Sequence, residues 1–207
     1  SNLASLWEGW SKNWFIGLDE NIPKSLGASI LVFWMFTVPW IAITLLLKNI
    51  DLIIEAMPKI VAIYPDLIFK IAGAGPLKEY LQNRINRLNL SDNIVLLGNL
   101  TDMENFYQSL TLYVHPSMIE GMSNSVLEAM SYGVPTVAAN IPASYEIIEN
   151  GYNGFLIEEN CPNYISSMII NIISDVEKLS KVSDNSFKYV KEFFGIQRMI
   201  KETVELY

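Results

Sequence analysis

The stretch LIFKIAGAGPLKEYLQNRINRL (residues 67–88) decides the fold, because it joins a short apolar strand to a helix through a glycine-rich turn. Its first six residues have the length and composition of a buried strand, and its last twelve have the spacing of a helix with one apolar face. Gly73 and Gly75 form the turn. The turn is not the dinucleotide-binding fingerprint, because the third glycine would fall on Lys78. The stretch therefore predicts one strand–helix unit of an α/β fold.

The same alternation of strand and helix patterns continues along the chain from residue 48. Asn49–Ala62 predicts a helix with one apolar face, and we expect a break or kink at Pro58, which lacks a backbone N–H. This order is typical of a Rossmann-like, doubly wound parallel sheet, whose ligands bind at the carboxyl ends of the strands. The expected strands are Leu67–Ala72, Ile94–Leu97, Leu112–His115, Pro135–Ala139 and Phe155–Ile157, the expected helices include Leu77–Leu88, Met103–Leu110 and Asn124–Tyr132, and two or three more follow Tyr164.

The segment EGMSNSVLEAMSY (Glu120–Tyr132) predicts a ligand site at one of these turns. Ser123 is of the residue type that serves as an N-cap, and Gly133 supplies the left-handed position that ends the helix. The free backbone N–H groups and the positive end of the helix dipole make the loop before this helix suitable for an anion such as a pyrophosphate. Two carboxylates eight positions apart, Glu120 and Glu128, lie in this loop and in the helix.

The segment resembles the Glu-x7-Glu motif of the family 4 glycosyltransferases, which are retaining enzymes of the two-domain GT-B architecture. Leu47–Leu81, Asn93–Gly121 and Gly133–Ile157 are similar to successive blocks of that family's C-terminal domain. The resemblance covers roughly residues 48–207. It implies one half of a GT-B fold that binds a nucleotide-diphosphate sugar as donor, with an acceptor domain supplied in trans. It also implies no metal or other cofactor, and a role in the synthesis of cell-envelope glycans.

The resemblance assigns roles to the two carboxylates. It implies that Glu128 accepts hydrogen bonds from the ribose hydroxyls of the donor, and that Glu120, the candidate catalytic residue, meets hydroxyls of the donor sugar. The alternatives are a solvated helix carboxylate for Glu128 and a charge that favours the helix dipole for Glu120. The glycines of the strand-to-helix turns have a purely steric alternative. The other expected donor-binding residues are Lys48, Gly75, Gly98, Asn99, Leu100, Gly121, Met122, Ser123 and Asn124.

One position departs from the resembled family, in which an arginine and a lysine five positions apart hold the donor diphosphate. Lys48 matches the lysine, but Ile43 stands at the position of the arginine. Loss of a charge-assisted partner removes about 2 kcal/mol of binding. The resemblance thus implies an ancestral glycosyltransferase activity. Two alternatives stay open: a non-catalytic nucleotide-sugar-binding module or partner subunit, and a truncated or fused gene fragment.

The first 47 residues differ sharply from the rest. Gly27–Leu47 has 21 residues without a charge, which is enough to cross a hydrocarbon core of about 30 Å. We therefore expect a transmembrane-like helix over residues 25–47, with a buried core helix as the alternative. Tryptophans on one face of residues 1–24 predict an interfacial helix, and Trp7–Leu18 resembles the membrane tail of family 2 glycosyltransferases. The expected chain is membrane-associated, and its catalytic domain, residues 48–207, is cytoplasmic.

Composition narrows the classes of partner. With 14 Lys and Arg against 22 Asp and Glu, the formal net charge is −8, which argues against a nucleic-acid partner. Neither an Asp-x-Asp pair nor a His or Cys cluster predicts a metal site. The single cysteine, Cys161, fits a reducing compartment. The single histidine, His115, ends an expected strand, where both a structural role and a catalytic base are open.

Overall fold

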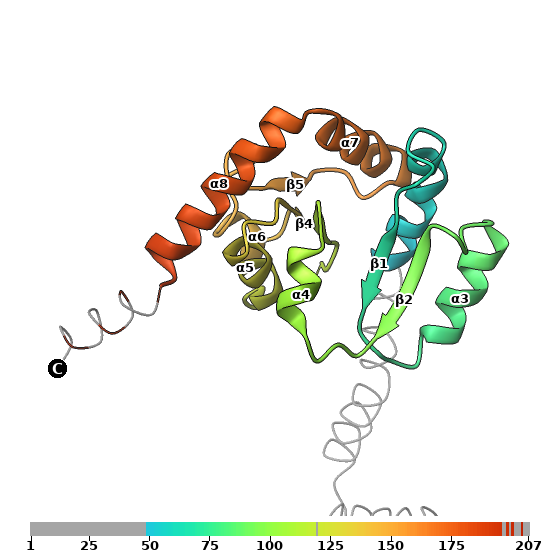
Figure 1. The fold of residues 1–207 in the computed structure, drawn as a ribbon, viewed down its shortest axis with the longest axis horizontal. Helices are drawn as coiled ribbons and strands as arrows, with labels where there is room; N and C mark the ends of the chain where they lie inside the picture. Colours follow the sequence, from blue (N-terminus) through green and yellow to red (C-terminus); the bar gives the residue numbers. More distant parts are fainter. Residues whose placement is uncertain (1–48, 119, 196–197, 199, 201–203, 205–207) are drawn as a thin grey trace, which may run out of the picture. The chain divides into compact units, whose positions relative to one another are not determined.

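The computed structural model describes residues 49–118, 120–195, 198, 200 and 204, all within the compact unit Leu46–Tyr207 (Figure 1). The predicted interfacial segment (residues 1–24), the predicted transmembrane-like segment (residues 25–47) and Lys48 lie outside these residues. Among the helices that the structure describes, none is long and apolar enough to span a bilayer. The membrane predictions for the first 47 residues therefore stay predictions.

Strands and helices alternate along the described chain, as the α/β prediction required. The predicted strands and helices all form, and their ends differ from the predictions by at most two residues. The short helix α6 is an addition that no sequence pattern predicted. After a helix over residues 49–61, the order is β1 (Phe69–Ala72), α3 (Lys78–Arg87), β2 (Ile94–Gly98), α4 (Met103–Gln108), β3 (Tyr113–His115), α5 (Asn124–Ser131), β4 (Thr136–Ala139), α6 (Pro142–Tyr145), β5 (Phe155–Ile157), α7 (Pro162–Ser174) and α8 (Val176–Phe193).

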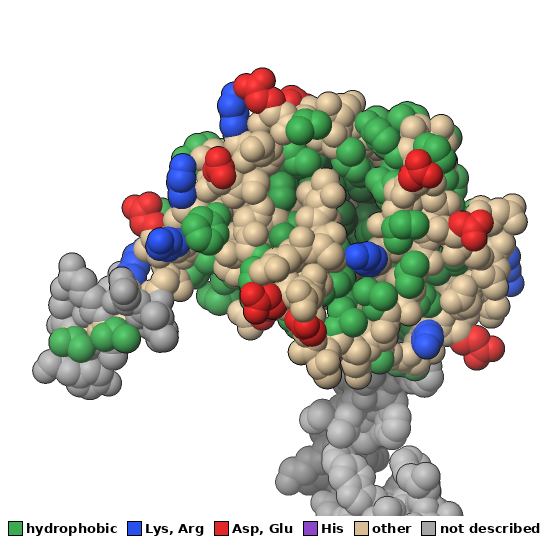
Figure 2. Space-filling view, in the orientation of Figure 1, with side chains coloured by type: hydrophobic (Ala, Val, Ile, Leu, Met, Phe, Trp, Pro, Cys, Tyr) green, Lys and Arg blue, Asp and Glu red, His purple; other side chains and the backbone are tan. Residues whose placement is uncertain are grey.

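All strand pairs that the structure describes are parallel, as predicted, and among the described residues they fall into two groups. β1 pairs with β2, and the second sheet has the order β3–β4–β5. β4 lies between two partners and is buried along its whole length, whereas β3 and most of β1 are only half-buried. Figure 2 shows a hollow with hydrophobic side chains in it between the regions that Figure 1 labels β1 and β4. Each of β1 and β3 thus has one edge without a partner strand among the described residues.

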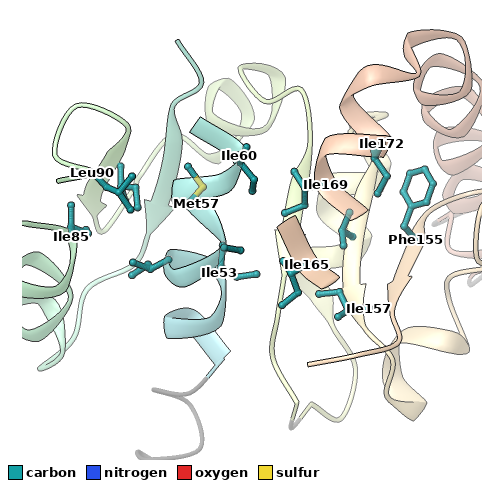
Figure 3. Close-up of a cluster of buried hydrophobic side chains, with 14 of the residues drawn as sticks. Ile53, Met57, Ile60, Ile85, Leu90, Phe155, Ile157, Ile165, Ile169 and Ile172 are labelled. Atoms are coloured by element: carbon teal, nitrogen blue, oxygen red, sulfur yellow. The ribbon is translucent and has the colours of Figure 1, made fainter. Parts of the chain in front are cut away.

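One hydrophobic core nevertheless spans both sheets (Figure 3). The helix over residues 49–61 contributes Ile53, Met57 and Ile60, which are each 1% exposed, and α7 contributes Ile165 and Ile169. Burying an aliphatic side chain of this size stabilises a fold by about 1.5–3 kcal/mol. The same core includes Ile94 of β2, Val137 of β4 and Phe155 and Ile157 of β5. Apolar packing therefore connects the two groups of strands within the described part of the chain.

We predicted a break or kink at Pro58, and the break is wrong, because the helix continues over residues 49–61, whereas the kink stays a prediction. Pro58 itself is exposed, while its neighbour Met57 and the nearby Ile54 are almost completely buried. The proline ring therefore lies away from the core. Apolar contacts on the opposite face of the helix outweigh the one backbone hydrogen bond that proline removes.

Candidate functional site

Helix α5 has the termini that the sequence predicted, but the structure shows no side-chain cap at its start. Gly133 has a φ of +69°, the left-handed conformation expected after a helix, and its N–H donates to the Met130 carbonyl at 3.0 Å. Ser123 occupies the N-cap position, but its hydroxyl makes no capping bond. The Ser123 carbonyl accepts the N–H groups of Val126 and Leu127, both at 3.1 Å, which are the ordinary first hydrogen bonds of a helix. The prediction that Ser123 is the N-cap residue is therefore right in position, but its hydroxyl does not make the capping bond.

The start of α5 has an excess of hydrogen-bond donors. Among the described residues, the backbone N–H groups of Gly121, Met122, Ser123 and Ser125 have no hydrogen-bond acceptor. The Ser123 side chain, in a residue only 1% exposed, has no partner in that set either. A buried hydroxyl without a partner is costly, and free N–H groups at a helix start carry partial positive charge. The local geometry therefore suits an anionic ligand.

Glu120, in the loop before α5, contacts His115 at the carboxyl end of β3. Glu120 Oε1 lies 3.2 Å from His115 Nε2, and the two side chains are 29% and 15% exposed. The other ring nitrogen, Nδ1, lies 3.3 Å from the Tyr113 hydroxyl and 3.4 Å from Ser125 Oγ. The strand β3 and the helix α5 thus both fix the imidazole, which in turn contacts the loop carboxylate.

Glu128, one helical turn into α5, has its own hydrogen-bond donor. The Tyr107 hydroxyl, from helix α4, lies 3.1 Å from Glu128 Oε2. The Tyr107 ring is almost fully buried and meets the Tyr113 ring edge-on, with 5.7 Å between centroids. Tyr113 in turn stacks on His115, with 6.1 Å between centroids. A continuous set of rings, Tyr107–Tyr113–His115, therefore lies beneath both predicted carboxylates.

Burial governs the ionisation of these rings. Burial, reinforced by the charges of nearby groups that include Glu128, raises the pKa of Tyr107 far above its ordinary value. Burial is also the main cause that raises the pKa of Tyr113. Both phenols therefore keep their protons and can donate hydrogen bonds. Burial lowers the pKa of His115, and the neighbouring Glu120 carboxylate opposes part of that shift. The imidazole is thus neutral at pH 7.

Of the remaining predicted residues, Gly75, Gly98 and Asn99 lie at or just after the ends of β1 and β2, and the other described ones lie beside or at the start of α5. Gly98 has a φ of +70°, and its carbonyl accepts a 2.8 Å hydrogen bond from the Gly73 N–H. This bond joins the ends of β1 and β2, so the turns that contain Gly75 and Asn99 start side by side. Leu100 packs in the same cluster as Tyr107 and Ala129, which places it beside α5. Met122 is 59% exposed, and Asn124, like Gly75, Asn99 and Gly121, is exposed. Within the part of the chain that the structure describes, no group of three His, Cys, Asp or Glu could hold a metal ion.

Sequence reasoning missed Tyr107, Tyr113 and Ser125. Tyr107 lies on the apolar face of its helix, so its pattern was that of a core residue, and Tyr113 lies in a strand of apolar residues. The alternation of a strand does place Tyr113 and His115 on one face. That spacing was the one available signal, and it gives no information about α4.

The family comparison matches this region of the chain. The model of the family described as glycosyl transferases group 1 matches residues 43–189, which is more than half of the sequence. The chain belongs to this family. Within it, an uncharacterized glycosyltransferase of Haemophilus influenzae is 31% identical over 156 residues, which are 75% of this chain and 44% of that protein. The chain thus spans less than half of the length of this group 1 relative.

Two solved structures, one of them a group 1 glycosyl transferase, are similar to this chain. The C-terminal domain of LpcC from Francisella tularensis has a TM-score of 0.65 at 27% identity, and the match covers 72% of this chain and 80% of that one. TarM from S. aureus, solved with UDP, fondaparinux and α-GlcNAc-glycerol, has a TM-score of 0.71 at 27% identity over 77% of this chain and 32% of its own. The described unit therefore has the fold of one half of a GT-B enzyme.

Proposed function

We propose that this chain binds a nucleotide-diphosphate sugar and is the donor-binding half of a glycosyltransferase. The observation that carries the proposal is the arrangement at α5. In the chain between Glu120 and Glu128 lie N–H groups and a buried Ser123 hydroxyl that have no partner among the described residues, and each of the two carboxylates has its own hydrogen-bond partner. The group 1 membership of the chain and the UDP in the TarM structure support the same chemistry.

The proposal divides the donor among three parts of the site. The diphosphate meets the N–H groups of residues 121–123 and 125, where the helix dipole favours negative charge. Glu128 accepts hydrogen bonds from the ribose hydroxyls through its exposed carboxylate, since one carboxylate can accept from two hydroxyls. Glu120 meets the donor sugar. The turns at Gly75 and Gly98–Leu100 lie towards the base, and Lys48 pairs with the diphosphate.

Sugar transfer itself requires more than the described residues. We propose that the acceptor comes from a separate domain in trans, that transfer retains the anomeric configuration as in family 4, and that no metal takes part. The proposal also places residues 1–47 at a membrane, with the donor site on the cytoplasmic side, in the synthesis of a cell-envelope glycan. The uncharged span Gly27–Leu47 supports the membrane part.

A screen of nucleotide sugars tests the binding function. The full chain is heated with UDP-, GDP- and ADP-glucose and UDP-GlcNAc, and its melting temperature is recorded for each ligand. Because a ligand that binds only the folded state stabilises it, one nucleotide should raise the melting temperature in a concentration-dependent way. Glu128→Gln should reduce that increase. Glu79→Gln, an equal charge change on the exposed surface of α3, should not. No increase with any nucleotide sugar would contradict the proposal.

A further inference from the structure

We propose that His115 is a positioning residue that orients Glu120 towards the donor sugar, separately from the nucleotide. This inference rests on the proposed function and adds a residue that neither family resemblance nor the sequence pattern assigned. It starts from one fact: among the described residues, His115 is the one hydrogen-bond partner of the Glu120 carboxylate. Glu120 lies in a loop without regular backbone hydrogen bonding, so this contact determines where its carboxylate points.

The hydrogen bonds around the ring determine which nitrogen carries the proton. Two hydroxyls, those of Tyr113 and Ser125, converge on Nδ1, and both can donate. With Nδ1 as acceptor, the proton of a neutral imidazole is on Nε2. It then points at Glu120 Oε1 and makes a hydrogen bond to a charged acceptor. The opposite tautomer would place the Nε2 lone pair against the carboxylate, so the network selects the tautomer that holds Glu120.

The same geometry leaves part of Glu120 available. Oε1 is the oxygen that His115 contacts, and Oε2 has no hydrogen-bond partner among the described residues. An oriented carboxylate with one uncommitted oxygen suits the recognition of a sugar hydroxyl. Glu128 has a parallel arrangement, because Tyr107 contacts its Oε2. The ring set Tyr107–Tyr113–His115 therefore holds the ribose carboxylate at one end and the sugar carboxylate at the other.

The titratable groups that face His115 come from each neighbouring element. Glu120 comes from the loop, Tyr113 from β3, and Glu128 and Tyr107 lie further along the ring set from α5 and α4. Tyr113 and Tyr107 keep their protons, so they add no charge near pH 7. The contact of His115 with Glu120 at neutral pH is consequently a hydrogen bond from a neutral imidazole.

Calorimetric titration of the full chain distinguishes the contribution of the sugar to binding from that of the nucleotide. The ligands are UDP, GDP and ADP, each beside its glucose conjugate, and the quantity of interest is the ratio of the two affinities. We expect His115→Phe to weaken binding of the glucose conjugate by about tenfold, because one hydrogen bond to a charged group is lost. The affinity for the bare diphosphate should stay nearly unchanged. His115→Gln, whose amide N–H reaches the place of Nε2, should restore most of the ratio. His115→Asn, which is too short, should not.

Glu120→Gln provides a second variant that keeps the test decisive. If His115 acts through Glu120, the double variant His115→Phe/Glu120→Gln should lose no more of the ratio than the single variants do. Equal losses for the diphosphate and its conjugate in His115→Phe would overturn the inference and leave the proposed function standing. The absence of any nucleotide binding by the wild type would overturn both.

The tautomer provides a readout that needs no ligand. The imidazole ¹⁵N shifts of the free protein should show a protonated Nε2 and an unprotonated Nδ1 near pH 7.5. A predominant Nδ1–H tautomer would contradict the positioning role whatever the affinities are.

Discussion

The Tyr107 hydroxyl donates a hydrogen bond to Glu128 Oε2 across 3.1 Å, which ties the helix α4 to the carboxylate that we assign to the ribose. Tyr107→Phe removes this bond and leaves the ring packing in place. We expect nucleoside diphosphate affinity to fall by up to about tenfold, the usual effect of one hydrogen bond. The measurement is a titration of the diphosphate into both proteins.

A matched control comes from Tyr132, whose ring stacks on Tyr107 with 5.7 Å between centroids. The Tyr132 hydroxyl makes no hydrogen bond among the described residues, so Tyr132→Phe should leave the affinity unchanged. An equal loss in the two variants would show that ring packing, and not the bond to Glu128, determines the effect.

The stability of the fold should depend on pH through His115. Burial lowers the pKa of His115 in the folded protein, although Glu120 raises it in part, while the unfolded chain has the ordinary value of about 6.5. The unfolded state therefore binds more protons as the pH falls below about 6.5, and the free energy of unfolding decreases there. Above that pH the stabilising contribution is complete. Urea unfolding at several pH values should show a smaller decrease for His115→Gln than for the wild type.

The pKa of His115 can also be measured directly. Glu120→Gln removes the charge that raises it, so an NMR titration should give a lower pKa in that variant than in the wild type. A higher pKa in Glu120→Gln would mean that the two side chains do not interact in solution.

Gly133 should tolerate no side chain. Its φ of +69° costs an L-residue about 1–2 kcal/mol, and an added Cβ would come within 3.3 Å of Ser183 Oγ. Gly133→Ala should therefore lower the free energy of unfolding by at least about 1 kcal/mol in a urea titration. Gly75→Ala is the control, because its φ is not in the left-handed region and nothing lies within 4 Å of its Cβ position. Equal effects would contradict the strain at Gly133.

Most of the fold follows from local patterns in the sequence. The stretch of residues 67–88 predicted β1, its glycine turn and α3, because apolar runs of four to six residues between turns are typical of buried parallel strands. The end of α5 was equally predictable, since Gly133 adopts the left-handed conformation that glycine permits. The short helix α6 was not predicted, because four residues are too few to show a helical period.

The two carboxylates of the candidate site were predictable from the sequence, but the side chains that hydrogen-bond them were not. Glu120 and Glu128 were found from a spacing within one segment, which a single sequence shows directly. Tyr107 reaches Glu128 from another helix, so no local pattern links them. Pro58 shows the opposite error: a strong local rule predicted a break, and the buried face of Ile54 and Met57 outweighed it.

The central claim is that the start of α5 and Glu128 bind a nucleoside diphosphate. The most direct measurement is a calorimetric titration of UDP, GDP and ADP into the full chain, its Glu128→Gln variant and its His115→Asn variant. The account predicts that the wild type binds one of the three, that Glu128→Gln weakens this binding by about tenfold to a hundredfold, and that His115→Asn changes it much less. No binding by the wild type, or equal weakening in the two variants, would contradict the account.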